Sequence, residues 1–79
     1  MLLYKHKEVI KMKYQLDIEY IKALRKEHHL SQAKVAKVLG YNQTAYGHRE
    51  LKIDKFQIKD LIKLAEFYQI PINNFFKEV

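Results

Sequence analysis

Along most of the chain, apolar residues recur at intervals of three and four, the spacing that places side chains on one face of an α-helix. Two long segments show this spacing, residues 17–29 and residues 56–70. Each predicts an amphipathic helix with one buried face. The side chains expected on these faces are Ile18, Ile21, Ala23 and Leu24 in the first segment and Ile58, Leu61, Ile62, Ala65 and Tyr68 in the second.

Polar residues and a glycine mark the helix boundaries between these segments. Asp17 is suited to cap the first long helix. Ser31 and Asn42 are suited to cap two shorter helices, and Gly40 can adopt the left-handed conformation that ends the first of them. Only Gly40 and Tyr41 link the two short helices, which predicts a sharp corner rather than an antiparallel hairpin.

The C-terminal stretch predicts one more short helix. Pro71 cannot continue the preceding helix, and the sequence "PINNFF" that it opens is expected to bury Phe75 and Phe76. "KIDK", residues 52–55, is interpreted as a loop. The pattern therefore predicts one all-α domain of five helices over residues 15–79.

Residues 1–14 follow a different pattern and are expected to form a basic N-terminal arm. In "YKHKEVIKMKY", lysines occupy odd positions while apolar and aromatic residues occupy most even ones. A period of two favours a short β-strand, and the same strand of a second copy is its natural partner. Two alternatives are open: a disordered arm, or sequence upstream of a start at Met12.

The distribution of charge along the chain is more informative about a binding partner than the net charge of +6. Residues 1–13 carry four lysines against one glutamate, and residues 31–55 carry five basic groups against two acidic ones. The other two segments balance. A basic surplus confined to part of a small domain suggests a polyanionic partner, whereas the plainer interpretation is a solvated surface.

Several function classes are disfavoured by the composition. The chain has no cysteine, and no apolar run approaches the roughly 18 residues of a membrane span. His28 and His29 are adjacent and point about 100° apart on a helix, so they are poor joint metal ligands. Asp54 and Asp60 are interpreted as surface charges. We expect a cytoplasmic protein that is not an enzyme and has no metal, cofactor, membrane or small-molecule partner.

Two short helices joined by a tight glycine turn make a helix-turn-helix, whose second helix can enter a DNA major groove about 12 Å wide. The spacing agrees with this interpretation. Ala36 is the fifth residue from Gln32, where the two helices touch and a large side chain would separate them. Gly40 is the ninth residue and lies in the turn, and Tyr41 and Tyr46 are expected to anchor the unit to the core.

The segments "ALRKEHHLSQAKVAKVLGYNQTAY" and "IKDLIKLAEFYQIPINNFF" resemble DNA-binding domains of the Cro and phage-repressor type, the Xre family. The resemblance covers about residues 17–76. It implies a five-helix bundle that binds double-stranded operator DNA as a two-fold dimer. It also implies that Arg25 and Glu50 form a pair tying the first helix to the end of the recognition helix.

The resemblance implies site residues as well. Gln43, Thr44 and His48 would face base edges, and glutamine has the donor and acceptor that match adenine. Gln32 would contact a phosphate at a helix N-terminus. The further candidates for contacts to the DNA backbone are Lys34, Tyr41, Asn42, Arg49 and Lys52.

Three positions depart from the family pattern. Gly47 stands where a small polar residue is common, so either a side chain there would collide with DNA or the glycine is simply tolerated. Arg49 replaces a large apolar residue, and its guanidinium is expected to reach Glu50 or a phosphate. Lys52 replaces a glycine in the following loop.

The sequence therefore predicts a small transcription regulator, a repressor of the phage or mobile-element type that binds an inverted repeat as a homodimer. The alternative is a protein-interaction module of the same fold, such as an antitoxin or a modulator of another repressor.

Overall fold

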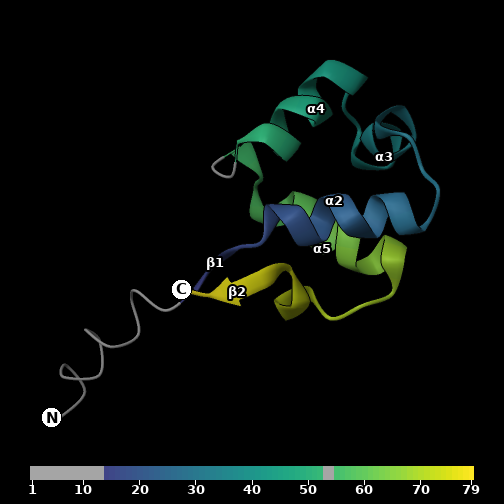
Figure 1. The fold of residues 1–79 in the computed structure, drawn as a ribbon. Helices are drawn as coiled ribbons and strands as arrows, with labels where there is room; N and C mark the ends of the chain where they lie inside the picture. Colours follow the sequence, from purple (N-terminus) through teal and green to yellow (C-terminus); the bar gives the residue numbers. More distant parts are fainter. Residues whose placement is uncertain (1–13, 53–54) are drawn as a thin grey trace, which may run out of the picture.

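The computed structural model describes residues 14–52 and 55–79, which form a helical domain with a small two-stranded sheet (Figure 1). The 3-10 helix η2 follows the four α-helices, and the two strands are formed by the ends of the described chain. The elements are β1 (Tyr14–Leu16), α2 (Ile18–Glu27), α3 (Gln32–Leu39), α4 (Gln43–Leu51), α5 (Ile58–Tyr68), η2 (Ile72–Phe75) and β2 (Phe76–Glu78).

Three helices begin at the capping residues that the sequence predicts. The side-chain oxygen of Asp17 accepts from the backbone N–H of Tyr20 at 3.0 Å. Ser31 caps α3 at 3.0 Å, and Asn42 caps α4 at 2.8 Å. Each cap satisfies an N–H group that has no partner within its own helix.

The corner between α3 and α4 depends on Gly40. Its φ of 84° lies in the left-handed region, which costs a residue with a Cβ atom more than glycine. A Cβ atom there would meet nothing within 4 Å, so the backbone conformation alone favours glycine. The N–H of Tyr41 then donates to the carbonyl of Ala36 at 2.8 Å and closes the turn.

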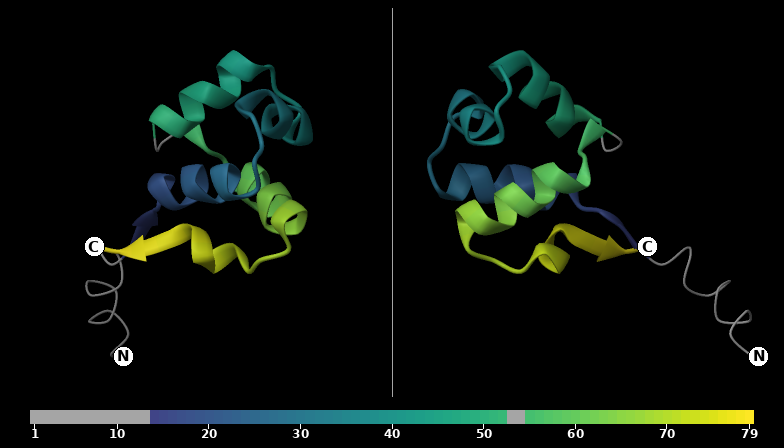
Figure 2. Two further views of the ribbon diagram at one scale, coloured as in Figure 1. Left: turned by 45° about the vertical axis from the view of Figure 1, so that its right-hand side comes forward. Right: turned by 180° about the vertical axis from the view of Figure 1, so that it is seen from behind.

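The core lies among the four α-helices and η2. Figure 2 shows α3 and α4 on the side of the domain opposite the sheet and η2. Ala36 is 1% exposed, and α3 and α4 pack against each other. The buried apolar side chains are Leu16, Ile21, Leu24, Val35, Ala36, Leu39, Tyr46, Leu61, Leu64, Tyr68 and Phe75.

The ends of the domain differ from the all-α prediction. β1 pairs antiparallel with β2, with Leu16 opposite Phe76, so the chain's own C-terminus supplies the partner strand. The strand predicted within the arm lies outside the described residues except for Tyr14. The expected fifth helix is only the 3-10 turn η2. It buries Phe75, whereas Phe76 is 38% exposed because it continues into β2.

The buried face of α5 is rotated relative to the prediction. Ile58 and Ile62 are 65% and 46% exposed, while Leu64 and Asp60 are buried. Ala23 on α2 is likewise exposed. Periodicity marks the helix, but Asp60 turns inward to accept hydrogen bonds, and this polar contact selects the face that α5 buries.

Candidate nucleic-acid interface

The three residues predicted to read bases lie together on the exposed side of α4. Gln43 and Thr44 occupy its first turn, His48 follows one turn later, and all three are exposed. They line a hollow of about 650 Å³ beside α4. Leu51, which the sequence analysis did not single out, continues this side and is 76% exposed. Its four-residue and seven-residue spacing from Gly47 and Thr44 is the signal that could have found it.

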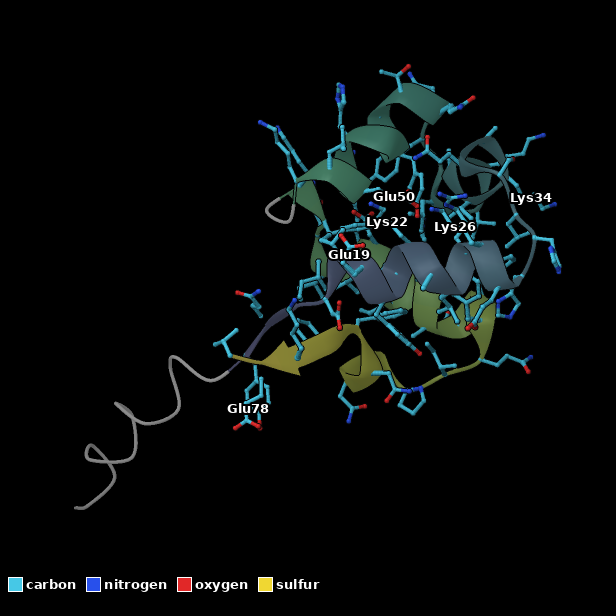
Figure 3. The ribbon with its side chains drawn as sticks, viewed as in Figure 1. Glu19, Lys22, Lys26, Lys34, Glu50 and Glu78 are labelled. Carbon is cyan, nitrogen blue, oxygen red and sulfur yellow. The ribbon has the colours of Figure 1, made fainter. Side chains whose placement is uncertain are left out.

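The predicted backbone contacts fall into two groups. Lys34 and Lys52 are exposed, one in the first turn of α3 and the other at the C-terminal end of α4. Lys34 extends away from the body of the domain (Figure 3). Asn42 is exposed, and its side-chain oxygen caps α4. Gln32, Tyr41 and Arg49 instead have partners inside the protein.

Arg25 and Glu50 form a bidentate ion pair between α2 and the C-terminal end of α4. The Nε atom of Arg25 donates to Glu50 Oε2 at 2.7 Å, and Nη2 donates to Oε1 at 3.0 Å. A third bond runs from Nη1 to the carbonyl of Leu30 at 2.9 Å. Both partners are buried, with 9% and 3% exposure. The pair joins α2, the loop after it and the end of α4.

Both members of this pair are held in their charged forms. Burial alone would raise the pKa of Glu50, but the hydrogen bonds from Arg25 and Gln32 hold that pKa below its usual value. The hydrogen bond to Glu50 raises the pKa of Arg25. Burial raises the pKa of Tyr68 to about 12 and raises the pKa of Tyr46 still more. The phenols of both tyrosines, which lie near the ion pair, are therefore neutral.

Gln32 also forms a hydrogen bond with the buried carboxylate of Glu50. Its Nε2 atom donates to Glu50 Oε1 at 3.0 Å, so the side chain expected at a phosphate has an intramolecular bond. The same side chain lies next to the glycine in α4. A Cβ atom on Gly47 would lie 3.2 Å from Gln32 Oε1, closer than an ordinary contact. Glycine at this position therefore leaves room for Gln32.

Asp60 is the residue that the sequence analysis misjudged most. It is 1% exposed and accepts three hydrogen bonds, so its interpretation as a surface charge was wrong. Its donors are the Tyr41 hydroxyl at 2.6 Å, Arg49 Nε at 3.3 Å and the backbone N–H of Gln57 at 3.0 Å. A carboxylate in the first turn of a helix, with an arginine at a usually apolar position, was the available signal.

Arg49 contacts this carboxylate rather than Glu50. Its Nη1 atom donates to the carbonyl of Ala45 at 2.9 Å, and its guanidinium carbon lies 3.8 Å from the centre of the Tyr41 ring. The hydrogen bond to Asp60 raises the pKa of Tyr41. Tyr41 and Arg49 thus fasten the turn and α4 to the start of α5.

Residues 14–52 and 55–79 contain neither a cluster of metal ligands nor a membrane-spanning helix. No group of three histidine or acidic side chains in this part of the chain could hold a metal ion. Among the same residues, no helix combines the length and apolarity needed to span a bilayer.

The Arg25–Glu50 pair makes a prediction about acid stability. Glu50→Gln should lower the free energy of unfolding at pH 7 by about 3 kcal/mol, because it leaves Arg25 buried without a charged partner. The folded-state pKa of Glu50 is lowered, so its contribution is complete above the unfolded pKa of about 4.3 and is lost as pH falls through the folded value. Urea unfolding from pH 7 to pH 3 should show the two proteins converging.

Exposed Glu66 provides the control, since Glu66→Gln should leave both stability and its pH dependence nearly unchanged. A gap between wild type and Glu50→Gln that stays constant down to pH 3 would contradict the prediction.

Tyr41→Phe tests the Asp60 cluster. Loss of the hydroxyl that donates to a buried carboxylate should lower the free energy of unfolding by about 1.5–3 kcal/mol. Tyr14 is 66% exposed, so Tyr14→Phe is the matched control and should unfold as wild type does. If the Tyr41 variant also unfolds as wild type does, its hydroxyl does not support the fold.

A double-mutant cycle tests the relation between Gly47 and Gln32. Alanine in a helix interior is favoured over glycine by about 0.8–1 kcal/mol. In the Gln32→Ala background, Gly47→Ala should therefore stabilise the protein by about that amount. In the wild-type background the gain should be smaller, because the new Cβ displaces Gln32 from Glu50. Equal gains in both backgrounds, measured by urea unfolding, would show that Gln32 does not constrain position 47.

Comparison with known proteins agrees with this geometry. A family model described as helix-turn-helix matches residues 21–75, which include α3, the turn and α4. Neither the search of curated proteins nor that of solved structures gives a match. The matched family consists of DNA-binding domains rather than enzymes. The chain therefore belongs to the Cro/C1-type, Xre-like helix-turn-helix family of DNA-binding domains.

Proposed function

We propose that this protein is a transcription repressor that acts in the cytoplasm and binds an inverted-repeat operator as a homodimer. The observation that carries the proposal is the orientation of α4. Glu50 and Arg49 hold it through buried ion pairs, while Gln43, Thr44 and His48 are exposed. A helix whose buried face is held by ion pairs and whose exposed face is polar is suited to enter the major groove.

Each exposed side chain has a base-reading chemistry. The amide of Gln43 can donate to and accept from adenine at once, and Thr44 can bond to a base or touch a thymine methyl group. His48, one turn further, can bond to a base edge. These contacts would supply selectivity, since phosphate contacts carry no direct sequence information.

Backbone contacts would surround this reading surface. Lys34 and Lys52 are exposed and can pair with phosphates. Gln32 is the first residue of α3, and Asn42 is the N-cap of α4. Helix N-termini favour phosphate binding through their free N–H groups. We assign Tyr41 and Arg49 a supporting role, because both are bonded to Asp60.

The homodimer is supported by exposed apolar side chains. Ile58 and Ile62 lie one turn apart on α5 and are 65% and 46% exposed. A second copy would cover such residues, and a two-fold axis would place two recognition helices about 34 Å apart on one face of DNA.

One observation favours the protein-interaction alternative. Leu51 adds an exposed apolar group to the side of α4 that carries Thr44 and His48. A protein partner would bury such an apolar residue readily.

Selection of bound sequences from a random DNA pool, followed by Gln43→Ala, tests the proposal. Enrichment of a palindrome is expected. On that operator, Gln43→Ala should lose about 1–3 kcal/mol of binding free energy and relax selectivity at one base position. Its salt dependence should hardly change, because no phosphate contact is removed.

Random duplex is the control DNA for this experiment. Equal weakening on operator and random duplex would exclude α4 as the reading helix. A wild-type protein that binds no duplex at low salt would reject the proposal and favour a protein partner.

A further inference from the structure

The hollow beside α4 has a basic wall on its α2 side. Its α4 side includes the predicted reading residues, and its α2 side contains Lys22 and Lys26. In Figure 3 both lysines lie between α2 and α4, in the same region as Glu50, and all three residues line the hollow. Lysines four residues apart on a helix share one side, so both ammonium groups can reach the same space.

The other charges around the hollow leave these lysines free to bind an anion. Glu50 is already neutralised by Arg25 at 2.7 Å. Lys22 has a contact of 3.8 Å with Glu19, whose side chain is 79% exposed, and exposed pairs of this kind are weak. Within the described residues, Lys26 is exposed and forms no salt bridge.

Gln32 adds a neutral donor to the same hollow. Its side-chain nitrogen carries two hydrogens, of which one is donated to Glu50 at 3.0 Å. The other is available to an acceptor. Two flexible ammonium groups and an oriented amide are suited to a phosphate oxygen, and they stand next to the helix that reads bases.

We propose that Lys22 and Lys26 bind a phosphate of the DNA strand that runs between α2 and α4. The inference rests on the proposed DNA-binding function and deepens it, because it extends the interface from the helix-turn-helix onto α2. The phosphate seated in this hollow fixes the distance of α4 from the backbone. Lys22 and Lys26 are therefore positioning residues, and the reading of bases stays with α4.

The test compares Lys22→Gln and Lys26→Gln with Lys63→Gln. Lys63 is exposed on α5, outside the hollow, and its replacement makes the same change in net charge. Binding is measured on the selected operator and on random duplex at several salt concentrations. Because both lysines contact the same phosphate, each hollow variant should reduce the slope of log K against log salt by less than the roughly 0.9 of one full phosphate contact and weaken both DNAs by the same factor. Lys63→Gln should leave the slope unchanged.

Other results would overturn the inference in distinguishable ways. Wild-type protein that binds no duplex at low salt removes the proposed function itself. If wild type binds duplex but the hollow variants show the same salt dependence as Lys63→Gln, DNA binding is retained and the proposed phosphate contact is rejected. If the variants weaken binding to the operator alone, the lysines contact bases rather than a phosphate, and the proposed phosphate contact is also rejected. Urea unfolding of all three variants shows whether a loss of binding comes from loss of fold.

Discussion

The ion pair between Arg25 and Glu50 is the interaction on which the position of α4 depends most. Glu50 is the eighth residue of α4, and its carboxylate receives bonds from α2 and α3, so three helices meet at one buried charge. Such a charge is tolerated only when it is paired and hydrogen-bonded. The orientation of α4 is therefore coupled to the positions of Arg25 and Gln32.

A second ion pair holds α4 from another direction. Arg49 precedes Glu50 in the sequence, and neighbouring residues of a helix point about 100° apart. Arg49 binds Asp60 at the start of α5, and Tyr41 joins them from the turn. The two pairs neutralise their own charges inside the domain. The basic residues that face solvent, among them Lys34 and Lys52, then determine the field that DNA meets.

Local signals in the sequence predicted much of this arrangement. Asp17, Ser31 and Asn42 cap their helices because capping depends on groups three residues apart, and Gly40 ends α3 because its φ is positive. The Arg25–Glu50 pair followed from the family resemblance. Features that depend on distant segments could not be predicted this way. The partner of β1 lies about 60 residues away, and the burial of Asp60 depends on donors from α4 and the turn.

The desolvation cost of the buried ion pairs indicates that they contribute more than stability. Replacing a buried ion pair with well-packed apolar residues is often neutral or stabilising, so stability alone does not explain the Arg49–Asp60 pair. Its bonds differ from apolar packing in having direction: they fix the rotation of α4 as well as its distance from α5. Apolar contacts tolerate small rotations, which would displace Gln43, Thr44 and His48 relative to a groove. In the proposed function, α4 presents three side chains to base edges, and that constraint would favour this, because each such contact requires a defined donor–acceptor geometry.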